Sequence, residues 1–189
     1  GAANVRAEEV EIELRAQVDR ALELEIPVSH LDTHMGALVC RPDLIEVYVR
    51  VGIDYDIPVL FLKQIDERVV KEYPALKEKG EQLLAALEDA EFPVLDGLAQ
   101  FYGGDTHEER LDNYEKTLRN LPPGVSQIII HCGYYDDELK AVTNSAQRRD
   151  GDRKIFTDPK IRELLDEEDI ELITWKQFRA MQAREPADE

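Results

Sequence analysis

Basic residues are scarce in this 189-residue chain, and it also has few cysteines and no long apolar runs. It contains 23 Lys and Arg against 41 Asp and Glu, which gives a formal net charge of −18 at pH 7. Such a surface repels phosphate groups, so the composition argues against DNA, RNA or an anionic membrane as the main partner. At 43% hydrophobic residues the chain is still apolar enough to fold around a core.

Signals for export and membrane insertion are also missing from the sequence. Residues 1–10 contain no apolar stretch of the kind found in signal peptides, and the longest apolar run, Ile57 to Leu62, has the length of a strand. The two cysteines, Cys40 and Cys132, are far apart and form no Cys-x-x-Cys pair. We therefore expect a cytoplasmic protein with two reduced thiols, and the spacing gives no support to a disulfide.

Several common catalytic motifs do not occur. The sequence has no Gly-x-Ser-x-Gly, no Walker A loop, no Gly-x-Gly-x-x-Gly and no His-Glu-x-x-His. Interpretations as a serine hydrolase, a P-loop protein or a Rossmann-type cofactor enzyme therefore lack their basic parts.

What the sequence does contain is an alternation of short apolar strands and amphipathic helices. The strands are predicted at Pro27–Leu31, Pro58–Leu62, Phe92–Leu95, Ser126–His131 and Ile170–Thr174. The helices are predicted at Glu8–Leu24, from Pro42 to Val51, within Ile65–Ala90 with breaks at Pro74 and Gly80, and at His107–Asn120, Asp158–Leu165 and Trp175–Ala183, with a loop at Gly133–Lys154. This alternation predicts one α/β domain over residues 1–189, built on a parallel sheet whose functional residues gather at the strand carboxyl ends.

Two of the four histidines lie in the segment SHLDTHMG, residues 29–36. If a strand continues through it, His30, Asp32 and His34 point to one face, because side chains alternate along a strand. Two imidazoles and a carboxylate on one face are suitable ligands for a divalent metal ion. Two alternatives remain open: the histidines are structural residues with satisfied hydrogen bonds, or Asp32 orients a ring instead of binding the metal.

The remaining histidines occupy different surroundings. His131 ends the strand SQIIIH, where an imidazole can transfer a proton or can be a structural residue bonded to the backbone. His107 lies among acidic residues at a helix start and is interpreted as a solvated surface residue. Cys132 is a further candidate zinc ligand, and the acidic run Asp136–Glu138 is more typical of a solvated helix start than of a cation site.

Four segments resemble the YdjC-like carbohydrate deacetylases, in order along the chain: PVSHLDTHMG, IIIHCGYYDDEL, RRDGDRKIFTDPKIRELL and IELITW. The resemblance implies an incomplete or irregular (β/α) barrel of the TIM type and a divalent metal ion, zinc or magnesium. It also implies removal of acetyl groups from N-acetylated sugars such as chitooligosaccharides. Of the family's metal ligands it carries over a His of the HLDTH word, for which His34 is preferred. His30, close by, would bind the metal or the substrate, His131 would be the proton donor, and Asp32 would support the site.

Arg149 and Asp152 match a downstream Arg-x-x-Asp pair of that family, which implies that they border the substrate. The chain departs from the family pattern at its start, because only 29 residues precede His30 and no Ala-Asp-Asp motif is present. It resembles the C-terminal part of such an enzyme, so we expect weak or no deacetylase activity from this chain alone. The alternative is a degenerate, non-catalytic barrel that binds sugar or serves assembly. Unpaired strand edges would favour a homodimer.

Overall fold

The structure, a computed structural model, describes residues 4–64, 71, 75–101 and 103–182. The chain forms two compact units, and each is described by itself. Unit 1 comprises residues 1–95 and 173–189, and unit 2 comprises residues 96–172. Unit 2 is therefore one continuous stretch of chain inserted between two parts of unit 1.

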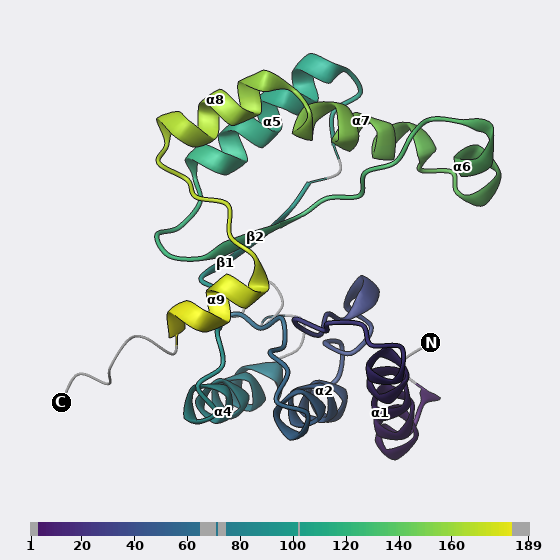
Figure 1. The fold of residues 1–189 in the computed structure, drawn as a ribbon, viewed down its shortest axis with the longest axis vertical. Coiled ribbons are helices and arrows are strands. Elements are labelled where there is room, and N and C mark those ends of the chain that lie inside the picture. The colour runs from purple at the N-terminus through teal and green to yellow at the C-terminus, as the bar shows by residue number, and fades with distance from the viewer. Residues whose placement is uncertain (1–3, 65–70, 72–74, 102, 183–189) are drawn as a thin grey trace. The chain divides into compact units, whose positions relative to one another are not determined.

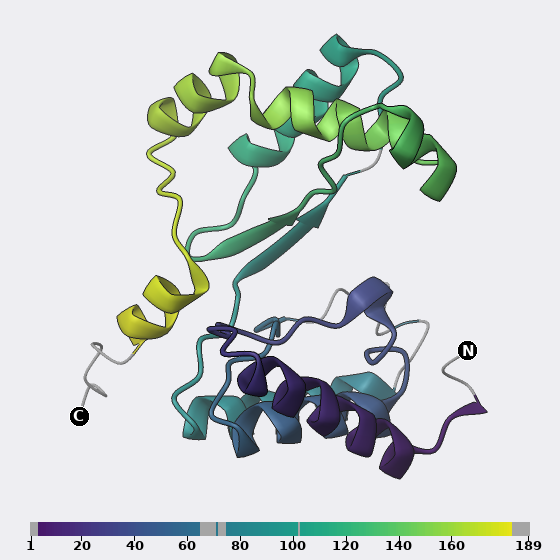
Figure 2. The ribbon, with the colours of Figure 1, turned by 45° about the vertical axis from the view of Figure 1, so that its right-hand side comes forward.

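Unit 1 places a layer of helices against short parallel strand segments. Its helical elements are α1 (Ala7–Glu23), the 3-10 helix η2 (His34–Gly36), α2 (Pro42–Asp54), α4 (Ala75–Asp89) and α9 (Trp175–Gln182). Helices α1, α2 and α4 lie side by side in this order (Figures 1 and 2). Leu31 pairs with Val59, and Leu62 pairs with Leu95, both in parallel. The segment around residues 59–62 therefore lies between the other two.

Helix α2 shows how the sequence builds this layer. Pro42 lies in its first turn, where a missing N–H costs nothing, and Asp43 places a negative charge near the positive end of the helix dipole. The Tyr48 hydroxyl donates to the Leu31 carbonyl oxygen at 2.7 Å and accepts from the Leu60 N–H at 2.9 Å. One buried side chain of α2 thereby joins two neighbouring strand segments.

Unit 2 is built on a two-stranded parallel sheet with helices packed over it (Figure 2). Strand β1 (Gly97–Gln100) pairs with β2 (Ser126–Ile129) in a register that sets Gly97 opposite Ser126. Its helices are α5 (His107–Arg119), α6 (Asp137–Val142), α7 (Ala146–Phe156) and α8 (Pro159–Glu167). Helix α5 contacts α7 and α8. The core between them contains Tyr114, Leu118, Ile155, Ile161, Leu164 and Leu165.

Side-chain caps fix where these helices begin. The Thr106 hydroxyl accepts from the Glu109 N–H at 3.1 Å, and the Glu109 carboxylate accepts from the Thr106 N–H at 3.2 Å, which is a complete capping box for α5. At α8, Asp158 accepts from the Lys160 N–H at 3.0 Å, and Pro159 takes the first helical position. The predicted starts of both helices are confirmed.

Three local predictions are wrong. Gly80 lies inside α4 and does not break it. The segment predicted as a loop, residues 133–154, contains α6 and most of α7, two polar helices whose few apolar residues leave little periodic signal. Residues 170–174 take part in no strand pairing among the described residues, and Leu172 is 65% exposed. Part of the predicted helical segment, at residues 65–70 and 72–74, lies outside the described residues.

The α/β class with parallel strand pairing is confirmed, whereas closure into a barrel remains a prediction. Within the part of the chain that the structure describes, no helix is both long enough and apolar enough to cross a membrane.

Candidate functional site

His30 lies directly before the Leu31–Val59 pairing in unit 1 and is half-buried. Its Nδ1 is 3.0 Å from the Ser29 hydroxyl oxygen, and its ring stacks on the indole of Trp175 with centroids 4.5 Å apart and planes at 7°. Burial lowers the pKa of His30 below the ordinary value of 6.5, and the charge of Asp32 opposes this shift in part. The imidazole is therefore neutral at pH 7, the state in which it can donate a lone pair to a metal ion.

The strand does not continue through His34. The chain leaves the extended conformation after Thr33, and His34–Gly36 form a 3-10 turn in which Met35 has φ 54°. The Thr33 hydroxyl accepts from the Leu38 N–H at 3.0 Å and closes this turn. The prediction that one strand face carries His30, Asp32 and His34 is therefore wrong, because the two-residue alternation ends before the third member.

A cavity of about 190 Å³ in unit 1 joins two of the predicted site residues. His30 and Asp32 both line it, together with the Tyr48 side chain. The rest of the lining comes from α1 and neighbouring segments: Leu14, Gln17, Val18, Ala21, Val28, Leu31 and Leu38. The structure thus brings His30 and Asp32 to a small, mostly apolar hollow, where low polarity strengthens electrostatic interactions.

The donor types in this region suit a zinc or magnesium ion only in part. Imidazole nitrogens and a carboxylate are ligands that zinc accepts, and magnesium prefers oxygen. Among the residues with described side chains, however, no three His, Cys, Asp or Glu residues form a group that could hold a metal ion. His30 and His34 can therefore supply only part of a ligand set.

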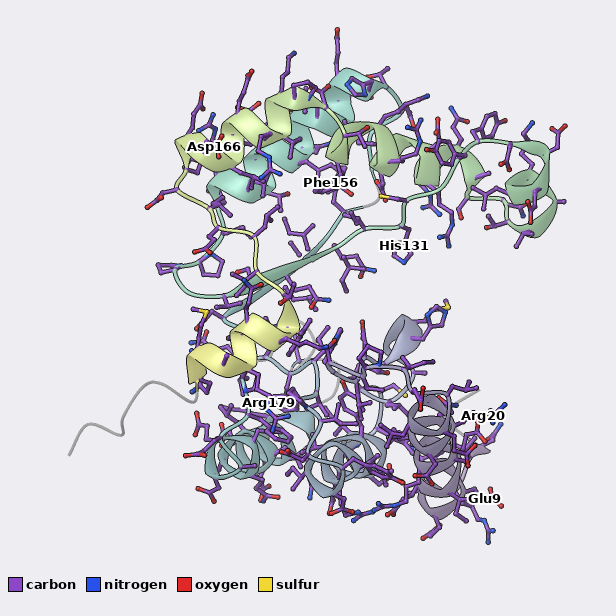
Figure 3. The ribbon with its side chains drawn as sticks, viewed as in Figure 1. Glu9, Arg20, His131, Phe156, Asp166 and Arg179 are labelled. Carbon is purple, nitrogen blue, oxygen red and sulfur yellow. The ribbon has the colours of Figure 1, made fainter. Side chains whose placement is uncertain are left out.

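His131 lies two residues beyond β2 in unit 2, and Figure 3 shows its side chain pointing away from α5 and α8. Its backbone N–H donates to the Asp152 Oδ2 at 3.1 Å. The predicted position of this histidine at a strand end is thus confirmed, and the main chain of His131 is tied to helix α7.

Asp152 lies in α7 and is 2% exposed. Its Oδ1 accepts from Arg110 Nη1 at 3.0 Å and from the Tyr114 hydroxyl at 3.0 Å, while Oδ2 accepts from the His131 N–H. Both oxygens are thus occupied by donors from the protein. Sequence reasoning missed Arg110 and Tyr114, although their spacing of four residues in a predicted helix places them on one face.

Arg149, one turn before Asp152 in the same helix, is half-buried. Its Nε donates to the Ser145 hydroxyl at 3.0 Å, and its carbonyl oxygen accepts from the Gly133 N–H at 3.2 Å. Helix α7 therefore holds the chain after β2 at two points, His131 and Gly133.

The other candidates behave as ordinary surface groups. His107 is partly exposed, and its Nε2 lies 3.0 Å from Asp158 Oδ2. Asp136 caps α6 by accepting from the Leu139 N–H at 2.8 Å, which confirms a solvated helix start there. Cys40 and Cys132 are both free thiols, as predicted. The candidate residues thus fall into two separate groups, one in unit 1 around His30 and one in unit 2 around His131.

Comparison with known proteins assigns the class. Residues 2–167 match the family model of YdjC-like proteins, and the chain therefore belongs to this family. It is 36% identical to a carbohydrate deacetylase of Thermus thermophilus over 92% of the chain, and 23% identical to a carbohydrate deacetylase of Thermoanaerobacter pseudethanolicus over 89%. The chain covers 61% and 59% of these two proteins, so it spans about three-fifths of the curated relatives that it matches.

A solved structure shows the same fold. It is an Enterococcus faecalis V583 protein to which cleavage of cellobiose phosphate has been ascribed, and the two chains align with a TM-score of 0.70 at 18% identity. The alignment covers 93% of this chain and 62% of the other. At this identity the likeness concerns the fold alone.

Proposed function

We propose that this chain forms part of a metal-dependent hydrolase that removes acetyl groups from N-acetylated sugars of the chitooligosaccharide kind. The proposal is carried by the match of 92% of the chain to a carbohydrate deacetylase. It is supported by His34 and His131, each of which comes shortly after a parallel strand pairing, where α/β proteins hold their reacting groups.

His34 and His30 would hold the metal ion, zinc or magnesium. Further metal ligands would have to join these two histidines, because the described residues form no group of three possible ligands. When bound, the ion polarises the acetamide carbonyl group. In the tautomer whose Nδ1–H donates to the Ser29 hydroxyl oxygen, at 3.0 Å, Nε2 carries the lone pair and would be the ligating nitrogen. The stack on Trp175 fixes the plane of the ring, and Asp32 beside it supports its orientation.

His131 supplies the proton in this proposal. The reaction adds water to the acetyl carbon and breaks the carbon–nitrogen bond, and the departing amine takes a proton from the His131 imidazolium. The products are acetate and an amino sugar. Arg149, at the first turn of α7 beyond the His131 segment, is the proposed contact for sugar hydroxyls.

The chain alone is expected to release little or no acetate. No general base is assigned among the described residues, and the reaction needs such a group to take the proton from the attacking water. Among the described residues, strands β1 and β2 pair only with each other, and their outer edges favour assembly with a second copy, which light scattering can test.

The test combines metal binding, sugar binding and acetate release. Isothermal titration with zinc or magnesium should show binding that His34→Ala abolishes and that His107→Ala, a change in a surface ion pair, leaves intact. With N-acetylated chitooligosaccharide as substrate, any acetate release should fall about 100-fold or more in His131→Ala and stay within about twofold in His107→Ala.

A protein that binds the sugar but takes up neither zinc nor magnesium in the titration would overturn the proposal in favour of a sugar-binding module. Metal binding that survives in His34→Ala would remove His34 from the ligand set.

A further inference from the structure

Unit 2 contains a buried ion pair that the proposed chemistry does not itself require. The Arg110 and Asp152 side chains are 6% and 3% exposed, and they meet at 3.0 Å between α5 and α7. Burying two charges costs desolvation free energy, which is recovered only when the remaining polar atoms are also hydrogen-bonded. The partners of this pair therefore indicate what it holds in place.

The two oxygens of Asp152 serve different parts of unit 2. Oδ1 accepts from Arg110 and Tyr114, both on α5, and so fixes the carboxylate against that helix. Oδ2 faces the other way and accepts from the His131 N–H at 3.1 Å. The second Arg110 nitrogen, Nη2, donates to the Gly104 carbonyl oxygen at 3.1 Å, which anchors the guanidinium in turn.

The backbone of α7 makes room for this arrangement at Gly151. A Cβ atom at that position would lie 2.8 Å from Arg110 Nε, closer than a side-chain carbon can approach without displacing the guanidinium. A glycine inside a helix costs about 1 kcal/mol relative to alanine, so its presence here fits a requirement for space.

A second hydrogen bond holds the same segment. The Gly133 N–H donates to the Arg149 carbonyl oxygen at 3.2 Å, so two amides on either side of Cys132 are fixed to α7. With its main chain fixed at both points, the segment after β2 sets the direction in which the His131 side chain leaves the sheet.

We propose that Asp152, held by Arg110 and Tyr114, is a positioning residue that fixes His131 through its backbone N–H. Asp152 then affects the reaction through His131 and makes no contact with the sugar, unlike the role that its match to the family pattern implied. The catalytic consequence rests on the proposed function of His131, whereas the positioning itself can be measured without any activity.

The experiment uses the intact chain labelled with ¹⁵N-histidine. The sequence has four histidines, so the amide spectrum contains four histidine signals. The signal that is missing from the spectrum of His131→Gln is that of His131. In Asp152→Asn the side chain loses its negative charge, and an NH2 group replaces one of its two oxygens. Because that group donates hydrogen bonds, it cannot accept one from Arg110 or from the His131 N–H. We expect the His131 amide to shift and to exchange its proton at least about tenfold faster than in the wild type.

Asp150→Asn is the matched control, because Asp150 lies on the same helix, is also buried and pairs with Arg153 and Lys154 instead. This variant should leave the His131 amide unchanged. The His107 amide, in the same unit, should keep its shift in both variants if unit 2 stays folded.

Tyr114→Phe decides the outcome if Asp152→Asn fails to fold, since it removes one donor to Oδ1 and keeps the ring. It should accelerate exchange at His131 in the same direction but by a smaller factor. An unchanged His131 amide in either folded variant, or an equal change in Asp150→Asn, would overturn the proposal. Positioning confirmed by these spectra together with a catalytically silent His131 would reject the proposed function alone.

Discussion

The imidazole of His30 lies flat against the indole of Trp175, with the ring centroids 4.5 Å apart and the planes only 7° from parallel. The two residues come from opposite ends of unit 1, because Trp175 opens the helix that follows the inserted unit 2. A candidate ligand near the start of the chain is therefore oriented by a residue near its end.

This stack predicts a specific dependence of stability on pH. Burial lowers the pKa of His30 in the folded state, so below the ordinary value of 6.5 the unfolded chain binds the proton more readily. The stabilisation from neutral His30 is complete above 6.5 and is lost as the pH falls from that value through the lower pKa of His30 in the folded protein. Urea unfolding followed by fluorescence of Trp175, the sole tryptophan, should show a larger loss between pH 7.5 and 5.5 in the wild type than in His30→Gln. Equal losses would contradict the prediction.

Tyr48→Phe should destabilise unit 1 by about 1–3 kcal/mol, because a buried hydroxyl that bonds two strand segments disappears. The same fluorescence-detected urea unfolding measures the loss. Tyr55→Phe is the control, since the Tyr55 hydroxyl bonds to Asp19 at the surface, and it should change stability by less than about 0.5 kcal/mol.

Thr106→Ala should weaken the start of α5 by about 1 kcal/mol, because it removes the hydroxyl that accepts from Glu109. Faster hydrogen exchange at the first turn of α5, including His107, would register the loss. Thr157→Ala, which removes an exposed hydroxyl bonded to the Arg153 carbonyl oxygen, should leave that exchange unaffected.

Gly151→Ala tests whether the space beside Arg110 matters. Helix propensity alone predicts a gain of roughly 1 kcal/mol, whereas contact of the new Cβ with the guanidinium predicts a loss of about 1–3 kcal/mol. We expect the loss to prevail, in a thermal melt followed by circular dichroism. Gln147→Ala, on the exposed side of the same helix, should be nearly neutral, and a more stable Gly151→Ala protein would show that the guanidinium moves freely.

Local signals in the sequence were enough to predict those helices whose apolar residues repeat at helical spacing and whose ends carry capping residues. Helix α2 was predictable because Pro42 and Asp43 mark its start and its buried residues follow one face. Helix α5 was predictable from Thr106, whose cap depends on residues three positions away. In both cases the deciding interactions are short-range in sequence.

Helix α7 was missed because its buried face carries charge. Asp150 and Asp152 are both buried there, and they are tolerated because Arg110, Arg153 and Lys154 pair with them. A pattern of apolar residues cannot reveal a buried carboxylate whose partner lies 42 positions away. The strand predicted at residues 170–174 is wrong for the opposite reason, since the apolar side chain of Leu172 stays exposed there.

The sequence alone pointed to the candidate residues of the site, but it predicted their geometry only in part. His131 follows a strand as predicted, but the turn at His34–Gly36 separates His34 from the line of His30 and Asp32. The positive φ of Met35 that makes this turn leaves no signature in residue type, because methionine has no preference for that conformation.

Helix α9 gives the chain an unusual vulnerability. Arg179 bonds to Asp56, and its guanidinium lies over the ring of Phe92 at 5.5 Å, so a helix that follows unit 2 in the chain packs against the part of unit 1 that precedes unit 2. Unit 1 can therefore close only after unit 2 has been synthesised, because α9 follows unit 2 in the chain. A premature stop codon after unit 2 would leave the hydrogen bond between His131 and Asp152 in place and would remove Trp175, which stacks on His30.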